Sequence, residues 1–143
     1  MLPEAGLTLL LIAGTIGAQT PTRVAIAGTD YAFVDVPQTI AAGPTLFSFV
    51  NRGTVRHEMS MVLLKPGVTM QQVMQRGPAA STSKVMAESL TGLLIARPGE
   101  SSGGQLYVEL KSGQRYLVIC NLRDQPDAKA HAELGMVTSF DVP

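Results

Sequence analysis

From residue 22 onward, the chain alternates short apolar segments with turns that contain Gly, Pro, Asn or Asp. Short segments rich in Val, Ile, Phe and Thr are typical of β-strands. Their number and spacing predict an all-β fold, a β-sandwich of seven or eight strands. The predicted strands are RVAIAG (23–28), YAFVDV (31–36), TLFSFVN (45–51), TVRHEMSMVLL (54–64), QLYVEL (105–110), QRYLVIC (114–120) and MVTSFDV (136–142), with a short apolar segment at 93–96.

Local signals add a hairpin and a helical insert. The Lys-Ser-Gly turn at 111–113 predicts that the strands on either side of it pair as a β-hairpin. A short helical insert is predicted around 68–90, beginning where Thr69 and Gln72 fit a capping box. Gly77 and Pro78 end its first helix, over 68–76, and the pattern over 82–90 predicts a second helix.

The N-terminal segment is almost continuously apolar. Its run AGLTLLLIAGTIGA, at 5–18, is similar to the apolar part of a secretory signal, but no basic residue precedes it. As a helix, this run would be about 21 Å long, shorter than the about 30 Å hydrocarbon core of a bilayer. We therefore expect an apolar signal-like or anchoring helix over 1–20, with a plain buried helix as the alternative, and one domain over 22–143.

Composition excludes several classes of function. Charged residues make up 15% of the 143 residues, and 11 basic side chains balance 11 acidic ones without forming a basic run, so we expect no nucleic-acid partner. The single cysteine has no partner for an internal disulfide. Two histidines are too few for a multicopper oxidase or a copper nitrite reductase, and we therefore predict that the protein is not an enzyme.

The cysteine and the histidines fall on positions that suit a metal site. Cys120 ends a buried strand, and His131 and Met136 follow it in the sequence. His57 lies in a strand whose alternation places it on the apolar face with Met59. A thiolate, two imidazoles and a thioether are the ligand set of a blue-copper site. Taken singly, each residue has an alternative role in core packing; together they use the whole cysteine and histidine inventory.

These segments resemble the cupredoxin family, the blue-copper proteins of the plastocyanin and azurin type. The resemblance rests on NRGTVRHEMSMVLL for the first histidine and on YLVIC followed by HAELGM for the rest; it covers residue 31 to the C-terminus without the helical insert. It implies an eight-stranded Greek-key sandwich, export to the periplasm and one-electron transfer. The ligands that it implies are His57, Cys120, His131 and Met136.

One feature departs from the family pattern. Ten residues separate Cys120 from His131, whereas the small electron carriers of the family have two or four. Arg123, Asp124 and Lys129 are expected around the exposed edge, where the small carriers present an apolar patch. The longer loop weakens the inference to a diffusible carrier more than the inference to copper.

The prediction is therefore a mononuclear type 1 copper protein for one-electron transfer, in the periplasm or at a membrane surface. Its expected partner is a redox protein, such as a cytochrome or a membrane complex, and the segment 1–20 is the expected means of membrane or complex attachment. The alternative is a cupredoxin-fold structural subunit of a membrane-associated complex, without copper. Copper delivery or storage is disfavoured because the seven methionines are scattered. Zinc is disfavoured because a thioether is a poor zinc ligand.

Overall fold

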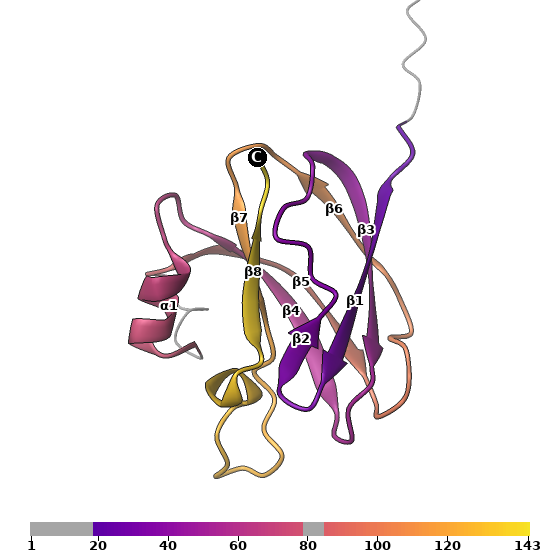
Figure 1. Cartoon of the computed structure of the whole chain (residues 1–143), viewed down its shortest axis with the longest axis vertical. Helices are drawn as coiled ribbons and strands as arrows, with labels where there is room; N and C mark the ends of the chain where they lie inside the picture. Colours follow the sequence, from indigo (N-terminus) through magenta and orange to yellow (C-terminus); the bar gives the residue numbers. More distant parts are fainter. Residues whose placement is uncertain (1–18, 79–84) are drawn as a thin grey trace, which may run out of the picture.

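The computed structural model describes residues 19–78 and 85–143. Over these residues the chain forms eight β-strands in two sheets with a short α-helix beside them (Figure 1), which confirms the predicted all-β sandwich. The apolar helix predicted over 1–20 falls outside the described residues, apart from its last two. In the described ranges, no helix is long and apolar enough to cross a bilayer. The strands are β1 Thr22–Thr29, β2 Ala32–Val34, β3 Gly43–Asn51, β4 His57–Leu64, β5 Ala87–Ala96, β6 Leu106–Leu110, β7 Arg115–Ile119 and β8 Val137–Asp141.

The two sheets combine strands that are distant in the sequence. The first sheet has the order β2-β1-β3-β6 and the second the order β5-β4-β7-β8. Neighbouring strands are antiparallel, except that β1 and β3 run parallel. The chain crosses between the sheets after β3, after β5 and after β6. These crossings place the apolar inner faces of the two sheets against each other.

The main core lies between the sheets. Phe47 and Phe49 of β3 and Met59 and Met61 of β4 are at most 1% exposed there. Burial of such side chains is the main favourable term in folding, at about 1.5–3 kcal/mol each. The remaining buried members of this cluster are Val24, Ile26, Ile40, Leu94, Ala96, Val108, Leu110, Tyr116, Val118, Phe140 and Val142.

A second apolar cluster covers the outer face of the second sheet. Val62 of β4 and Leu117 and Ile119 of β7 pack there with Val73 of the helix α1, Met70–Arg76. The central strands β4 and β7 are consequently buried on both faces. Figure 1 shows α1 lying outside this sheet, beside β7 and β8.

The predicted hairpin between β6 and β7 is wrong, although the positions of both strands are confirmed. Strand β6 pairs with β3, and β7 pairs with β4 and β8, so the turn at 111–113 connects two different sheets. A short glycine turn is compatible with a hairpin and with a crossing between sheets. Long-range pairing decides between them, because β7 is hydrogen-bonded to β4 on one edge and to β8 on the other, and neither edge is left for β6.

The helical insert is confirmed for its first part only. Helix α1 begins with the capping box of Thr69 and Gln72 and ends at Gly77 (φ 90°). The second helix predicted over 82–90 is wrong from Ala87 onward, because Ala87–Leu90 belong to β5; residues 79–84 lie outside the described part. Two register shifts in the β4–β5 pairing interrupt the alternation that would have marked this segment as a strand.

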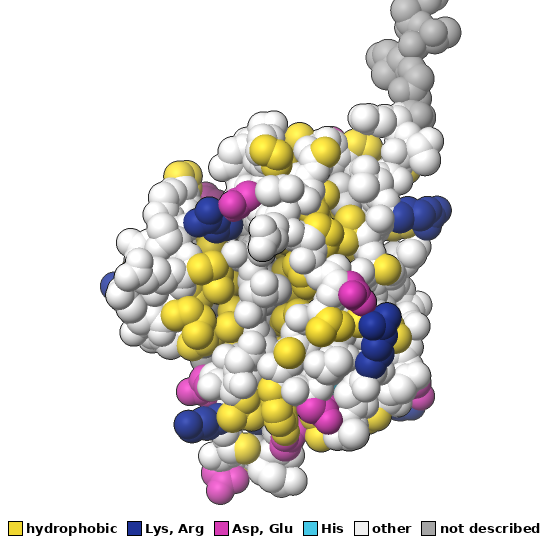
Figure 2. All heavy atoms as spheres, in the orientation of Figure 1, with side chains coloured by type: hydrophobic (Ala, Val, Ile, Leu, Met, Phe, Trp, Pro, Cys, Tyr) yellow, Lys and Arg dark blue, Asp and Glu magenta, His cyan; other side chains and the backbone are white. Residues whose placement is uncertain are grey.

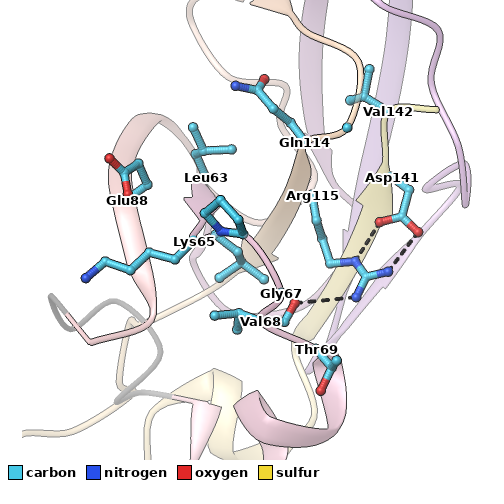
Figure 3. A pocket seen from close by; sticks show the side chains of 13 residues that line it. Leu63, Lys65, Gly67, Val68, Thr69, Glu88, Gln114, Arg115, Asp141 and Val142 are labelled. Atoms are coloured by element: carbon cyan, nitrogen blue, oxygen red, sulfur yellow. Dashed lines mark hydrogen bonds and ion pairs between the residues drawn. The ribbon is translucent and has the colours of Figure 1, made fainter.

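An open pocket of about 570 Å³ lies at the end of β4 that is opposite His57 (Figure 3). On its wall, Arg115 donates two hydrogen bonds to Asp141, at 2.6 and 3.0 Å, and a third to the carbonyl oxygen of Val68 at 3.4 Å. This fork joins β7 to β8 and to the segment before α1. The hydrogen bonds from Arg115 lower the pKa of Asp141.

Replacing Asp141 with Asn is expected to lower the free energy of unfolding at neutral pH by about 1 kcal/mol or less, because the pair is partly exposed. A lowered carboxyl pKa stabilises the fold above the unfolded-state value of about 3.9, and this contribution is lost as the pH falls through the folded-state pKa. Urea unfolding at several pH values measures the difference. Glu88→Gln, on the same pocket wall, is the control. A difference that stays constant down to pH values below the folded-state pKa would contradict the assignment.

Candidate metal centre

Three of the predicted ligands meet at one end of the sandwich. His57 begins β4, Cys120 directly follows β7, and His131 begins the short 3₁₀ helix His131–Leu134. The two Nδ1 atoms are 3.1 Å apart, and the Sγ atom of Cys120 lies 3.4 Å from Nδ1 of His131. One ligand atom from each residue lies within 4.8 Å of the other two. All three residues are 0% exposed, and no histidine is visible on the face shown in Figure 2.

Pairing between β4 and β7 accounts for the approach of His57 to Cys120. The register places Ser60 opposite Ile119, so the beginning of β4 lies beside the end of β7. The backbone N–H of Glu58 then points to the Sγ atom of Cys120 at 3.4 Å. His57 and Cys120 therefore approach each other from two neighbouring strands of one sheet.

The long segment between Cys120 and His131 returns to its starting point. The backbone N–H of Ala132 donates to the carbonyl of Cys120, and that of His131 to the carbonyl of Leu122, each at 2.8 Å. These two bonds close the base of the loop 121–130. The loop therefore delivers His131 to the site despite its length.

The backbone of Met136 lies beside Cys120 and His131. Its N–H donates to the carbonyl of His131 at 2.9 Å, and its carbonyl accepts from the N–H of Cys120 at 3.1 Å. The residue before it, Gly135, has a φ of 116°, which glycine adopts without strain. Met136 is 0% exposed and its methyl group packs against Gly28. Its role as the axial ligand stays a prediction.

The pKa shifts of Cys120 and His57 favour a neutral thiol and a neutral imidazole until a cation is present. Burial raises the pKa of the Cys120 thiol, against the backbone N–H groups of Glu58 and Leu122, which lower it. Burial also lowers the pKa of His57, against Asp30, which raises it. A neutral imidazole is the form that binds a metal, and a bound cation would favour the thiolate.

Three further residues surround the histidines. Asp30 Oδ1 lies 3.2 Å from Nε2 of His57, and Asp124 Oδ1 lies 3.0 Å from Nε2 of His131. The hydroxyl of Tyr31 donates to Asp124 Oδ2 at 2.6 Å. The ring of Tyr31 meets both imidazoles edge-on, with centroids 6.2 Å from His57 and 5.0 Å from His131.

Sequence reasoning missed Asp30 and Tyr31, and it assigned Asp124 only to the exposed edge of the site. These residues come from the β1–β2 turn and from the long loop, so no spacing in the sequence connects them with the histidines. One structural signal is the positive φ of Tyr31, 64°, because non-glycine residues in this conformation gather at functional sites.

The donor set fits a metal ion. Two nitrogens that are each about 2.0 Å from an ion, at a tetrahedral angle, are about 3.3 Å apart, and a nitrogen and a sulfur are about 3.5 Å apart. The separations of 3.1 and 3.4 Å are close to these values. If the Nε2 atoms donate to the carboxylates, the buried Nδ1 lone pairs face each other, and a cation between them satisfies both.

Comparison with solved structures shows the fold. Reduced auracyanin from Roseiflexus castenholzii aligns with a TM-score of 0.54 at 18% identity, over 87% of this chain and 99% of its own. Auracyanin B aligns with a TM-score of 0.54 at 20% identity, over 88% and 92% of the two chains. Auracyanin A from Chloroflexus aurantiacus, described as a "blue" copper protein, aligns with a TM-score of 0.54 at 21% identity, over 87% and 100%. No protein-family model and no curated protein matches the chain.

These alignments confirm the fold class that the sequence predicted. The protein is a cupredoxin-like β-sandwich, built on the same plan as the auracyanins. At this level of identity the alignments establish the arrangement of strands and no more. The assignment of a metal and of an activity rests on the site itself.

Proposed function

We propose that this protein is a mononuclear type 1 copper protein that transfers single electrons. The observation that carries the proposal is the convergence of the only cysteine and both histidines, fully buried, with Nδ1 and Sγ atoms 3.1 to 3.4 Å apart. Thiolate and imidazole ligands with a weak thioether select copper. The description of auracyanin A as a blue copper protein supports the same conclusion.

Four residues would hold the ion: Cys120 through Sγ, His57 and His131 through Nδ1, and Met136, more weakly, through its thioether sulfur. Copper bound there supplies a one-electron redox couple. The chain's own contribution is rigidity, since Cys120 adjoins β7, His57 lies in β4, and the backbone of Met136 is bonded to Cys120 and His131. Burial of the site excludes water from the donors, and the burial of Cys120 would help to set the potential.

The proposal includes the biological setting inferred from the sequence. The protein would act as an exported or periplasmic electron carrier, with residues 22–143 as the copper domain. Its partner would be another redox protein, and 1–20 would be a signal or an attachment segment. Electron transfer between proteins requires no catalytic residue here, in keeping with a carrier that is not an enzyme.

Copper loading of the purified metal-free protein tests the proposal. We expect one equivalent of Cu(II) to bind, to give an intense blue colour, and to lose that colour reversibly on reduction. Absorption spectroscopy and metal analysis measure colour and stoichiometry, and Zn(II) loading gives a colourless control. A colourless protein without stoichiometric copper would overturn the proposal and leave the structural subunit as the function.

A further inference from the structure

The outer edge of each imidazole contacts one carboxylate. Asp30 reaches His57 from the β1–β2 turn, and Asp124 reaches His131 from the loop 121–130. The two histidine side chains are 0 and 1% exposed, whereas the carboxylates are 36 and 35% exposed. The carboxylates therefore stand between the buried rings and the solvent at both histidines.

Further donors hold both carboxylates in place. Asp30 accepts from the N–H of Thr54 at 2.8 Å and from its hydroxyl at 2.6 Å. Asp124 accepts from the hydroxyl of Tyr31 at 2.6 Å. Gly53 leaves the space that the contact between Asp30 and His57 needs, because a Cβ at this position would overlap Asp30 Oδ1 and lie 2.9 Å from Nε2 of His57.

Building on the proposed function, we propose that Asp30 and Asp124 are positioning residues that orient both imidazoles toward the metal and lower its reduction potential. Each carboxylate accepts the Nε2–H of its histidine, so that the Nδ1 lone pair points to the ion. A partner of this kind fixes the tautomer and raises the basicity of a ligand imidazole. Two negative charges near the ion stabilise Cu(II) more than Cu(I).

The same inference explains the length of the loop between Cys120 and His131. The segment of ten residues carries Asp124 to the outer edge of His131. There the carboxylate of Asp124 lies within hydrogen-bond distance of the imidazole and accepts a hydrogen bond from Tyr31. Contacts of Arg123 with the carbonyl of Ala128 and with the carboxylate of Glu133, the latter at 3.6 Å, tie this loop to itself and to the 3₁₀ helix. The additional residues therefore close an edge of the site.

Asparagine variants of the copper-loaded protein test the effect of charge, since asparagine keeps the shape of aspartate. We expect Asp30→Asn and Asp124→Asn each to weaken Cu(II) binding by about 10-fold or more. Cu(I) affinity should fall less than Cu(II) affinity. The reduction potential should therefore rise by about 59 mV for each factor of ten by which the loss of Cu(II) affinity exceeds the loss of Cu(I) affinity. Competition titration and voltammetry measure the two quantities. The control is Asp127→Asn, on the loop that also carries Asp124. If Asp30→Asn and Asp124→Asn change the Cu(II) affinity and the reduction potential no more than this control does, the proposal is overturned.

Alanine variants of the metal-free protein test the hydrogen bonds without copper. In wild type we expect the Nε2–H protons of both imidazoles to exchange slowly in NMR spectra. Asp30→Ala should remove this protection at His57, and Asp124→Ala at His131. Asp127→Ala should affect neither. If neither Nε2 atom of the wild-type protein carries a proton, the proposal about Asp30 and Asp124 is overturned. If the Nε2–H protons are protected but the protein binds no copper, only the proposed function is overturned.

Discussion

Replacing Cys120 with serine is expected to abolish the blue colour of the copper-loaded protein. The colour of a type 1 site arises from charge transfer between the thiolate sulfur and Cu(II), and a serine hydroxyl is a hard donor that remains protonated. The loss of Cu(II) affinity should exceed the about 10–100-fold loss that is typical when the outer partner of a ligand is removed. Absorption spectroscopy and competition titration with a chelator measure the two effects.

Two controls separate this result from a folding defect. The metal-free Cys120→Ser protein should keep the circular dichroism of the wild type, because the change is nearly isosteric. The variant Met74→Leu removes a sulfur from a side chain on α1 that is half exposed, and it should leave the colour unchanged. A Cys120→Ser protein that retains the intense absorption would show that the sulfur is not a copper ligand.

The largest expected effect on stability follows from truncating Phe140 to alanine. This ring in β8 is 1% exposed, stacks on Tyr116 with centroids 5.2 Å apart, and lies 5.9 Å from the ring of Phe47. Removing a buried phenylalanine side chain costs about 3–5 kcal/mol, because the transfer free energy is lost and a cavity remains. Against a typical total of about 5–15 kcal/mol, this loss would bring the protein close to unfolding.

Urea unfolding of the metal-free protein measures this change in the free energy of unfolding. Ser139→Ala, at the neighbouring and only partly buried position of the same strand, should change stability by about 0.5 kcal/mol or less. Copper loading should shift both proteins to higher unfolding temperatures, since a ligand that binds only the native state stabilises it. If Phe140→Ala unfolds with the same midpoint urea concentration as the wild type, the stacked ring of Phe140 contributes nothing to stability.

The chain's small inventory made the candidate ligands readable. With one cysteine and two histidines, very few combinations of donors exist, and strand alternation places His57 on the buried face of β4 with Met59. The capping box at Thr69 was equally readable, because its hydrogen bonds connect residues three apart. Signals of this kind depend on neighbours in the sequence and are therefore independent of the rest of the fold.

Which strands pair with each other could not be predicted from such local signals. The strand segments on either side of the turn at 111–113 were located correctly, yet they lie in different sheets. Alternation tells which face of a strand is buried and is silent on which strand lies next to it. For β5 the register shifts against β4 also interrupt the alternation itself, and the local pattern over 82–90 favours a helix instead.

The sequence by itself determined the type of fold and the residue types available for a metal, since both follow from local periodicity and from counting. Tertiary structure alone decided how the site is enclosed. Asp30 and Tyr31 come from the β1–β2 turn, and Asp124 comes from the loop 121–130, 93 positions after Tyr31 in the sequence. Their approach to the histidines depends on how the two sheets and the long loop pack, a long-range property that no segment of the sequence encodes separately.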